Sequence, residues 1–253
     1  MWGDGVRLAL GTLTAFPTPP PRRVDRDVAR TAMVVAPVVA LPLATLVGLM
    51  SWIGNELSLP SLVTAAIAIG CLALGSRAMH LDGLADTADG LTASYDRERS
   101  LEVMKRGNSG PAGAATLVIV LAIQIAALAT LLSRPYGPLV AGVLVCCSRA
   151  ALTLACMRGV PAAREDGLGV TYTQTVPRSI AALVWTLVAG VCIGALWLTG
   201  LPWWHGVIAV LLAIATVGIL LWKSVARFGG VTGDTFGASI EVALTALFVA
   251  ASA

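Results

Sequence analysis

Apolar residues occur along this chain in seven long runs, each close to the length that a helix needs to cross a bilayer. The runs are Thr31 to Ile53, Ser61 to Met79, Ala112 to Leu132, Leu139 to Met157, Ser179 to Thr199, Gly206 to Trp222 and Gly237 to Ala253. A bilayer core requires about 20 apolar residues per helix, and it holds no water to satisfy free backbone groups. The pattern predicts an all-α, polytopic integral membrane bundle of about seven transmembrane helices. Residues 1–253 are expected to form a single membrane-embedded domain.

A further apolar segment, from Trp2 to Phe16, differs from these runs because charged residues interrupt it. Asp4 and Arg7 lie within it, and a proline-rich stretch from Phe16 to Pro21 follows. This composition is typical of a helix that lies in the membrane interface, so we predict an N-terminal interfacial helix. The segment does not have the basic cluster, short apolar core and small-residue cleavage site of a signal peptide.

The composition indicates that lipid is the main environment of the chain. Of its 253 residues, 57% are hydrophobic and 12% are charged, and the mean hydropathy of +0.84 excludes an ordinary soluble globule. The net charge of +3 is too small to indicate nucleic-acid binding, so no nucleic-acid partner is expected. The five cysteines show neither CxxC nor Cys/His spacing, and we predict neither a disulfide framework nor a zinc site.

The basic residues are distributed unevenly among the polar segments between the runs. If the runs alternate in direction, 15 of the 17 Lys and Arg residues fall on one side, Arg134 falls on the other, and Arg149 lies within the fourth run. Cytoplasmic loops of membrane proteins carry such an excess of positive charge. The N-terminus and the charged loops are therefore predicted to face the cytoplasm.

Three aspartates with helical spacing are the strongest chemical signal in the chain. Asp82, Asp86 and Asp89 lie at i, i+4 and i+7 in the segment from His80 to Gly90, and no Lys or Arg lies among them. On a helix they share one face and repel one another. Such carboxylates suit a hard divalent cation, so we predict a Mg²⁺ site, with Mn²⁺ as the alternative, over a solvated acidic helix end. His80 is open to two interpretations, proton transfer or substrate orientation on one hand and a local hydrogen bond on the other.

A second set of polar residues lies near the other predicted cytoplasmic helix ends. It comprises Arg149, Arg164 in the segment Ala163 to Gly169, Lys223, and then Thr232, Asp234 and Glu241 in the segment Gly229 to Glu241. The Gly-rich backbone of the last segment could cradle a phosphate, or Asp234 could add a metal ligand. Glu241 lies inside an apolar run, where ionisable groups are costly. Arg149 and Glu241 are therefore either partners of each other or ligands of a substrate.

Taken together, these segments resemble the adenosylcobinamide-GDP ribazoletransferase family, also called cobalamin synthases. The resemblance covers most of the chain and rests on Thr14 to Pro19, His80 to Gly90, Leu101 to Lys105, Ser148-Arg149, Ala163 to Gly169 and Gly229 to Glu241. The aspartate segment is its most specific part. The resemblance implies a multi-pass protein of the bacterial cytoplasmic (inner) membrane that uses Mg²⁺ and whose active site faces the cytoplasm.

The resemblance also implies a reaction. Adenosylcobinamide-GDP and α-ribazole, or its 5′-phosphate, would give adenosylcobalamin, or its 5′-phosphate, and GMP. A metal that bridges the diphosphate would stabilise the leaving group. Asp82, Asp86 and Asp89 are then expected as metal ligands and, together with His80, as catalytic residues. The expected substrate-binding residues are Arg149, Arg164 and Lys223, which suit phosphates, and Thr232, Asp234 and Glu241, of which the two acids alternatively complete the metal site.

One segment departs from the family pattern. Many members carry an Asp-Ser pair shortly after Met-Lys or Met-Arg, whereas this chain continues from Met104-Lys105 with Arg106 to Gly110. Asn108 stands where a variant of the motif places its aspartate, and an amide carries no charge for a cation. The effect of this altered loop on activity is left open.

Other membrane proteins also place aspartates at helix ends. A CDP-alcohol phosphotransferase has an Asp-x-x-Asp-Gly-x-x-Ala-Arg core, which differs from the Asp-x-x-x-Asp-x-x-Asp found here, and Asp234 with Glu241 is a poor second motif for a prenyltransferase. A transporter would carry its ionisable residues near the bilayer midplane, whereas here they gather at one face. The sequence leaves open the base of the ribazole and whether the chain assembles with copies of itself or with other cobalamin enzymes.

Overall fold

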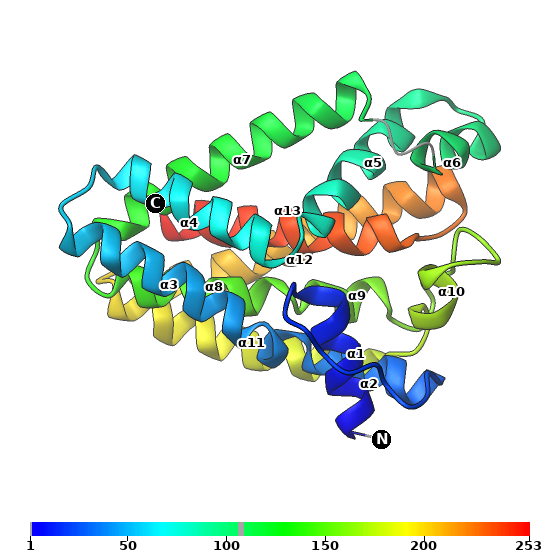
Figure 1. The fold of residues 1–253 in the computed structure, drawn as a ribbon, viewed down its shortest axis with the longest axis horizontal. Coiled ribbons are helices and arrows are strands. Elements are labelled where there is room, and N and C mark those ends of the chain that lie inside the picture. Colours follow the sequence, from blue (N-terminus) through cyan, green and yellow to red (C-terminus); the bar gives the residue numbers. More distant parts are fainter. Residues whose placement is uncertain (1, 106–108) are drawn as a thin grey trace.

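The computed structural model describes residues 2–105 and 109–253. The regular secondary structure of this part of the chain is helical, and its loops contain two isolated backbone bridges, Met157–Val176 and Ala162–Val231. In chain order its helices are α1 (Trp2–Leu13), α2 (Arg26–Val39), α3 (Leu41–Glu56), α4 (Ser61–Gly75), α5 (Met79–Ala93), α6 (Arg97–Lys105), α7 (Pro111–Leu132), α8 (Gly137–Ser148), α9 (Ala151–Ala155), α10 (Leu168–Tyr172), α11 (Arg178–Leu198), α12 (Trp204–Phe228) and α13 (Gly233–Ala251). Figure 1 shows an elongated bundle whose long helices run mainly along one axis. The predicted all-α class is confirmed.

Six helical segments of the described chain are long and apolar enough to cross a membrane. They are α2–α3 (Arg26–Glu56), α7, α8–α9 (Gly137–Ala155), α11, α12 and α13. A seventh is added if α4 and α5, which meet at 89°, count as one broken span. The predicted polytopic bundle is therefore confirmed, with six or seven crossings. The first and fourth predicted runs are each interrupted, at Ala40 and at Arg149, by one or two residues that belong to neither flanking helix.

The corner between α4 and α5 is sharper than the sequence predicts. The apolar run continues to Met79, but α4 ends at Gly75, and Arg77 and Ala78 adopt left-handed backbone with φ of 57° and 54°. Residues other than glycine rarely adopt this conformation, so the surrounding contacts must hold it. Nη2 of Arg77 donates to the carbonyl oxygen of Gly11, 2.6 Å away, which ties the corner to α1. The chain thus turns just before its aspartate segment.

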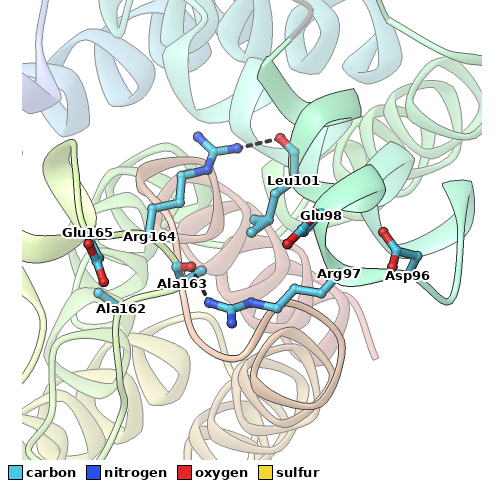
Figure 2. Close-up of a pocket in the computed structure, with 8 residues that line it drawn as sticks. All are labelled: Asp96, Arg97, Glu98, Leu101, Ala162, Ala163, Arg164 and Glu165. Carbon is cyan, nitrogen blue, oxygen red and sulfur yellow. Dashed lines mark hydrogen bonds between the residues drawn. The ribbon is translucent and has the colours of Figure 1, made fainter.

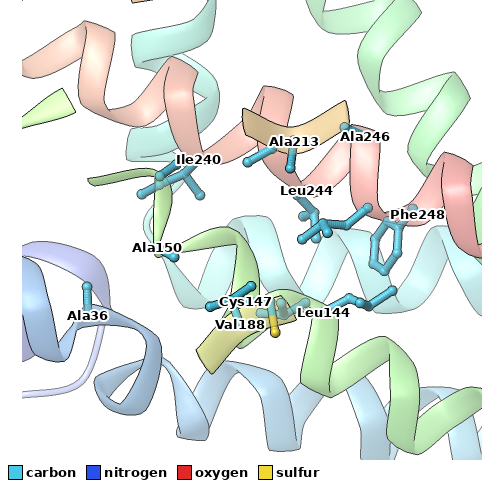
Figure 3. Packing of buried hydrophobic residues seen from close by; sticks show 14 of the residues in the cluster. Ala36, Leu144, Cys147, Ala150, Val188, Ala213, Ile240, Leu244, Ala246 and Phe248 are labelled. Atoms are coloured by element: carbon cyan, nitrogen blue, oxygen red, sulfur yellow. The ribbon is translucent and has the colours of Figure 1, made fainter. Parts of the chain in front are cut away.

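Helix α13 forms the centre of the bundle. Within its most apolar stretch 78% is buried inside the protein, against 28% for α7 and 33% for α11 and for α12. Its small residues allow α5, α7, α8 and α12 to pack closely around it. Figure 3 shows Ile240, Leu244 and Phe248 of α13 in one apolar cluster with Leu144 of α8 and Val188 of α11. The short, alanine-rich last run is therefore the most buried span.

Helix α2 begins at an exposed aspartate cap and carries α1 along its side. Asp25 accepts hydrogen bonds from the backbone N–H groups of Val28 and Asp27, at 2.8 and 3.1 Å. The bond from Val28 is the main reason that the pKa of Asp25 lies below its ordinary value. Gly5 of α1 packs against Thr31 of α2. Helix α1 is a separate element at the side of the bundle (Figure 1), and its location in a membrane interface stays a prediction.

Candidate functional site

Helix α5 crosses α13 near the start of both helices, and two glycines allow their backbones to touch. A Cβ atom added to Gly83 of α5 would lie 2.6 Å from the carbonyl oxygen of Asp234. One added to Gly237 of α13 would lie 3.0 Å from the Cα of His80. Backbone atoms cannot yield as a flexible side chain can, so the crossing at Gly83 requires glycine. This reciprocal contact brings the acidic residues of α5 to the first turn of α13.

Three side chains at this crossing form what we call the carboxylate group: Asp82 and Asp86 of α5 and Asp234 of α13. Asp82 and Asp234 lie close enough to Asp86 to interact electrostatically with it, and so does Asp89. Asp82 is exposed, whereas Asp86 is 9% exposed. Among the described residues, Arg164 is the basic side chain that acts on both Asp86 and Asp234. One neighbouring cation does not balance three carboxylates, so the group favours the approach of further positive charge.

Asp89, the third aspartate of the predicted metal triad, is engaged elsewhere. Its Oδ2 accepts the backbone N–H of Gly110 at 2.6 Å, and its Oδ1 accepts that of Gly113 at 2.8 Å. These donors lie at the N-terminal end of α7, where N–H groups have no partner within the helix. Each carboxylate oxygen keeps a second lone pair. In this structure, however, Asp89 caps α7 and holds it against α5.

Arg164 is positioned by a contact between two loops. The backbone N–H of Val231 donates to the carbonyl of Pro161, and that of Ala163 donates to the carbonyl of Val231, both at 2.9 Å. The side chain of Arg164 then reaches α6, where its Nη2 donates to the carbonyl of Leu101 at 2.7 Å. Arg164 therefore lies between α6 and the start of α13, next to the carboxylate group.

The Gly-rich segment before α13 ends in a helix cap. Oγ1 of Thr232 accepts the N–H of Thr235 at 3.3 Å, and Oγ1 of Thr235 accepts the N–H of Thr232 at 3.2 Å. The Thr232 hydroxyl also donates to Oδ2 of Asp234 at 3.2 Å. Thr232 thus orients Asp234 in the first turn of α13, where the helix dipole favours negative charge.

A second set of ionisable side chains lies deeper in the bundle, and we call His80, Arg149 and Glu241 the buried group. His80 and Glu241 are each 5% exposed, and Arg149 is fully buried. Nδ1 of His80 lies 3.9 Å from Oε1 of Glu241, whose other oxygen accepts a hydrogen bond from Nε2 of Gln124 at 2.9 Å. Glu241 therefore links α13 to α5 and to α7.

Arg149 makes no hydrogen bond with Glu241, its predicted protein partner, in the described chain. Its Nη1 donates to the carbonyl of Val145 at 2.9 Å and to Oγ of Ser148 at 2.8 Å. Nε and Nη2 have no hydrogen-bond partner among the described residues. Glu241 is close enough to interact with Arg149 electrostatically, but the two form no ion pair within 4.0 Å in the described chain. The burial of Arg149 also keeps it from solvent and hence from a dissolved phosphate.

Lys223, which the sequence also singles out, belongs to neither group. Lys223 is exposed on α12 and, within residues 2–105 and 109–253, has no hydrogen-bond or ion-pair partner. Asn108 and Arg106 lie outside the described residues. Gln124, on the other hand, is a contact that sequence reasoning missed. It could have been found as a lone amide within the long apolar run of α7, because polar side chains in such runs usually bond to another helix.

The metal site stays a prediction. Within the described part of the chain, no three His, Cys, Asp or Glu side chains are already placed around a common ion position. The carboxylate group nevertheless offers only oxygen atoms, which are the ligands that Mg²⁺ prefers. Mg²⁺ commonly binds through one or two carboxylates and completes its shell with water and substrate phosphates. The residues present therefore fit a cation that is shared with a phosphorylated ligand.

A cleft of about 630 Å³ lies on the other side of Arg164. It is lined by residues of α6, the segment before it and the loop after α9: Asp96, Arg97, Glu98, Leu101, Ala162, Ala163, Arg164 and Glu165. Figure 2 shows Arg97 and Arg164 extending toward backbone carbonyl groups. Arg97 donates to the carbonyls of Phe228 and Ala163 at 2.7 and 2.8 Å. Sequence reasoning missed this cleft, because nothing in the spacing of its charges distinguishes them from charges on a solvated loop.

The whole chain has close relatives among known proteins. The model of the family described as cobalamin-5-phosphate synthase matches residues 5–252. An adenosylcobinamide-GDP ribazoletransferase from Nocardioides sp. strain JS614 is 49% identical over 247 residues, which cover 98% of this chain and 97% of the relative. Relatives of the same name from Frankia casuarinae and Pseudomonas entomophila are each 36% identical, over 95% and 96% of this chain and 91% and 96% of their own lengths. No solved structure matches the chain. The chain belongs to the cobalamin-5-phosphate synthase family.

Proposed function

We propose that this protein is a Mg²⁺-dependent adenosylcobinamide-GDP ribazoletransferase of the bacterial inner membrane. It joins adenosylcobinamide-GDP to α-ribazole, or its 5′-phosphate, and releases GMP, so that adenosylcobalamin or its 5′-phosphate is formed. The observation that carries the proposal is the carboxylate group beside Arg164, which lies at one end of an apolar bundle. The chain that bears it aligns almost end to end with relatives of that name.

The chemistry of the transfer matches these side chains. A ribose hydroxyl of the ribazole attacks the phosphorus attached to the cobinamide arm, and the bond from that phosphorus to the bridging oxygen breaks. The electron pair of that bond leaves with GMP, and the hydroxyl proton passes to a carboxylate or to water. Bound Mg²⁺ supplies positive charge that neutralises the diphosphate. Asp82, Asp86 and Asp234 are the residues that would hold it, because Asp89 is engaged at α7.

The roles of the neighbouring residues follow from their exposure. Arg164 is partly exposed beside Asp86 and Asp234, so its guanidinium is placed to attract the substrate diphosphate to the carboxylate group. Thr232 keeps Asp234 oriented. His80 is enclosed between α5 and α13, which makes it a less accessible proton acceptor than the exposed Asp82. We therefore assign His80 to the support of α5.

The orientation in the membrane follows from the distribution of charge. If the predicted runs alternate in direction, 15 of the 17 Lys and Arg residues fall on the same side as Asp82, Asp86 and Asp234, and positive charge marks the cytoplasmic side. The C-terminal Ala253 lies at the other end, where its backbone oxygen accepts a hydrogen bond from Arg134 at 2.6 Å. A reporter that is active only in the cytoplasm should therefore work when fused to the N-terminus and fail when fused to the C-terminus.

The reaction is tested with the full chain purified in detergent or in nanodiscs. GMP release is measured with adenosylcobinamide-GDP, α-ribazole and Mg²⁺ present together, and again with each of them omitted. The proposal expects release that requires all three components and that stops on addition of a chelator. Release without ribazole would indicate a diphosphate hydrolase. Release at full rate in the presence of the chelator would contradict the metal dependence while leaving the transfer intact.

A further inference from the structure

The cleft that Arg164 lines contains none of the three residues of the carboxylate group, and it offers free carboxylates of its own. Its two guanidinium groups are partly engaged by backbone carbonyls: Arg97 donates to Phe228 and Ala163, and Arg164 donates to Leu101 through Nη2, while Nε of Arg164 has no partner among the described residues. Glu98 and Glu165, by contrast, have no hydrogen-bond or ion-pair partner within the described residues. The cleft therefore offers hydrogen-bond acceptors to a ligand that brings donors.

The arrangement of the side chains selects one of these acceptors. In Figure 2 the carboxylate of Glu98 points into the space framed by Arg97, Arg164 and Ala163, whereas Glu165 lies at the rim beside Ala162. Asp96, the third acid of the cleft, is partly occupied, because its Oδ1 accepts the backbone N–H of Arg99 at 2.8 Å. Glu98 is thus the acid best placed to receive two parallel donors from a ligand in the cleft.

Resting on the proposed function, we infer that this cleft binds the guanine base of the nucleotide substrate and that Glu98 reads its edge. Guanine presents N1–H and an exocyclic amino group side by side, and a carboxylate accepts from both with its two oxygens. Adenine presents an acceptor, its N1, where guanine presents N1–H. A carboxylate oxygen that faces adenine N1 therefore has no donor to accept from. Glu98 is accordingly a specificity-determining residue for guanine.

The position and size of the cleft agree with this assignment. A volume of about 630 Å³ lies within the range of 300–1,000 Å³ that is usual for small-ligand sites. Arg164 lines the cleft and also acts on Asp86 and Asp234, so a single residue adjoins both places. A nucleotide with its base in the cleft can therefore extend its phosphates past Arg164 toward the carboxylate group. The released product, GMP, would then keep its base in the cleft until it dissociates.

The test measures binding of labelled GMP, IMP and AMP to the full chain in nanodiscs by equilibrium dialysis, without corrinoid or ribazole. We expect GMP to bind about tenfold or more tightly than IMP, which has no exocyclic amino group, and more tightly still than AMP. Glu98→Gln should weaken GMP binding by about tenfold and narrow the difference between GMP and AMP, because an amide accepts one guanine donor and also suits adenine. Glu165→Gln, in the same cleft, should weaken GMP binding less than Glu98→Gln does, and Glu56→Gln at the end of α3 should leave GMP binding within about twofold.

The outcomes separate this inference from the transferase proposal. GMP binding that fails to distinguish the three bases, or that Glu98→Gln leaves unchanged, overturns the assignment of the cleft. Glu165→Gln with the larger effect overturns the role of Glu98. Either result is compatible with Mg²⁺- and ribazole-dependent GMP release, whose loss would instead count against the proposed reaction. Base-selective GMP binding that depends on Glu98, in a chain that shows no transfer, would support the cleft alone.

Discussion

Two groups of charged side chains include residues of α5, and they differ in how far their charges are compensated. In the buried group, Glu241 is enclosed and bonded to Gln124, with His80 and Arg149 nearby. In the carboxylate group, Asp82 is exposed, and Asp86 has like charges as its nearest electrostatic neighbours. A buried ionisable group is tolerated when opposite charge and hydrogen bonds compensate it. A cluster of like charges is tolerated when function requires it.

This difference indicates that the buried group stabilises the fold and that the carboxylate group is available to bind a ligand. Within the buried group, Glu241 of α13 contacts His80 of α5 and accepts a hydrogen bond from Gln124 of α7, so this group fixes where α5 lies on the central helix. The carboxylate group joins the first half of α5 to the start of α13, and Arg164 compensates only part of its negative charge. Mutations should therefore separate the two groups, because changes in the first affect stability and changes in the second affect chemistry.

The largest difference between the effect on activity and the effect on stability is expected for Asp86→Asn. This substitution keeps the shape of the side chain and removes one negative charge from the carboxylate group, so the rate of GMP release should fall by about 100-fold or more. Stability should not fall, because Asp86 loses repulsion from Asp82 and Asp89 at helical spacings, which is worth a few tenths of a kcal/mol. The melting temperature, measured by differential scanning fluorimetry, should stay the same or rise slightly.

The matched control for Asp86→Asn is Asp27→Asn. Asp27 is also a helical aspartate, but it is exposed, pairs with Arg30 on α2 at an N–O distance of 3.0 Å, and lies outside the carboxylate group. Transfer at the wild-type rate is expected from this variant. A large loss of both activity and melting temperature in Asp86→Asn would place Asp86 with the structural residues and break the comparison.

The buried group should show a large effect on stability and a coupling between its members. Glu241→Leu leaves Arg149 as a buried charge without its nearby carboxylate, and Arg149→Leu leaves Glu241 without its nearby guanidinium. Breaking a buried pair in direct contact costs about 3–5 kcal/mol, so each single change should cost less than that here, because Arg149 and Glu241 form no ion pair within 4.0 Å; replacing both charges by apolar residues is often neutral. The double variant should therefore melt at a higher temperature than the sum of the two single changes predicts. Additive changes in melting temperature would show that Arg149 and Glu241 are independent.

Asp89→Asn should give an intermediate result, because Asp89 lies between the two types of behaviour. An amide oxygen can accept one of the two N–H groups of Gly110 and Gly113, while its NH₂ opposes the other. The loss of a helix cap costs about 1 kcal/mol. Thermal melting should fall by a few degrees, and GMP release should fall less than in Asp86→Asn. A loss of GMP release equal to that of Asp86→Asn, at unchanged melting temperature, would indicate that Asp89 is a metal ligand.

The fold could largely be predicted from the sequence, because hydrophobic runs of bilayer length leave the chain few alternatives. The corner at Arg77 and Ala78 could not, since it interrupts an apolar run with residues that do not favour left-handed backbone. The central position of α13 could not be predicted either. Its alanine-rich composition made it the weakest span by hydropathy, and the same small residues let four helices pack around it.

The sequence predicted which residues form the candidate site better than it predicted the contacts that these residues make. Spacing placed Asp82, Asp86 and Asp89 on one helix face, and the Gly-rich segment before the last apolar run indicated Asp234 as a further metal ligand. Helical spacing could not show that Asp89 turns toward the start of α7, because both donors there are backbone N–H groups of glycines. Nor could it show that the loops that carry Arg164 and Asp234 are joined by backbone hydrogen bonds at Val231, because backbone bonds do not depend on the pattern of side chains.

The smallest effect is expected at Lys223, where sequence and structure give different expectations. The sequence suggests a phosphate ligand, but Lys223 is exposed on α12 and has no partner in the described chain. Lys223→Met should therefore change stability by no more than about 0.5 kcal/mol and leave GMP release within about twofold. The informative measurement is the KM for adenosylcobinamide-GDP, with Arg164→Met as the matched variant. We expect Arg164→Met to raise this KM by about tenfold or more, because Arg164 adjoins Asp86, Asp234 and the cleft. An equal rise of this KM in both variants would show that Lys223 also contributes to substrate binding, so that the binding region would extend along α12.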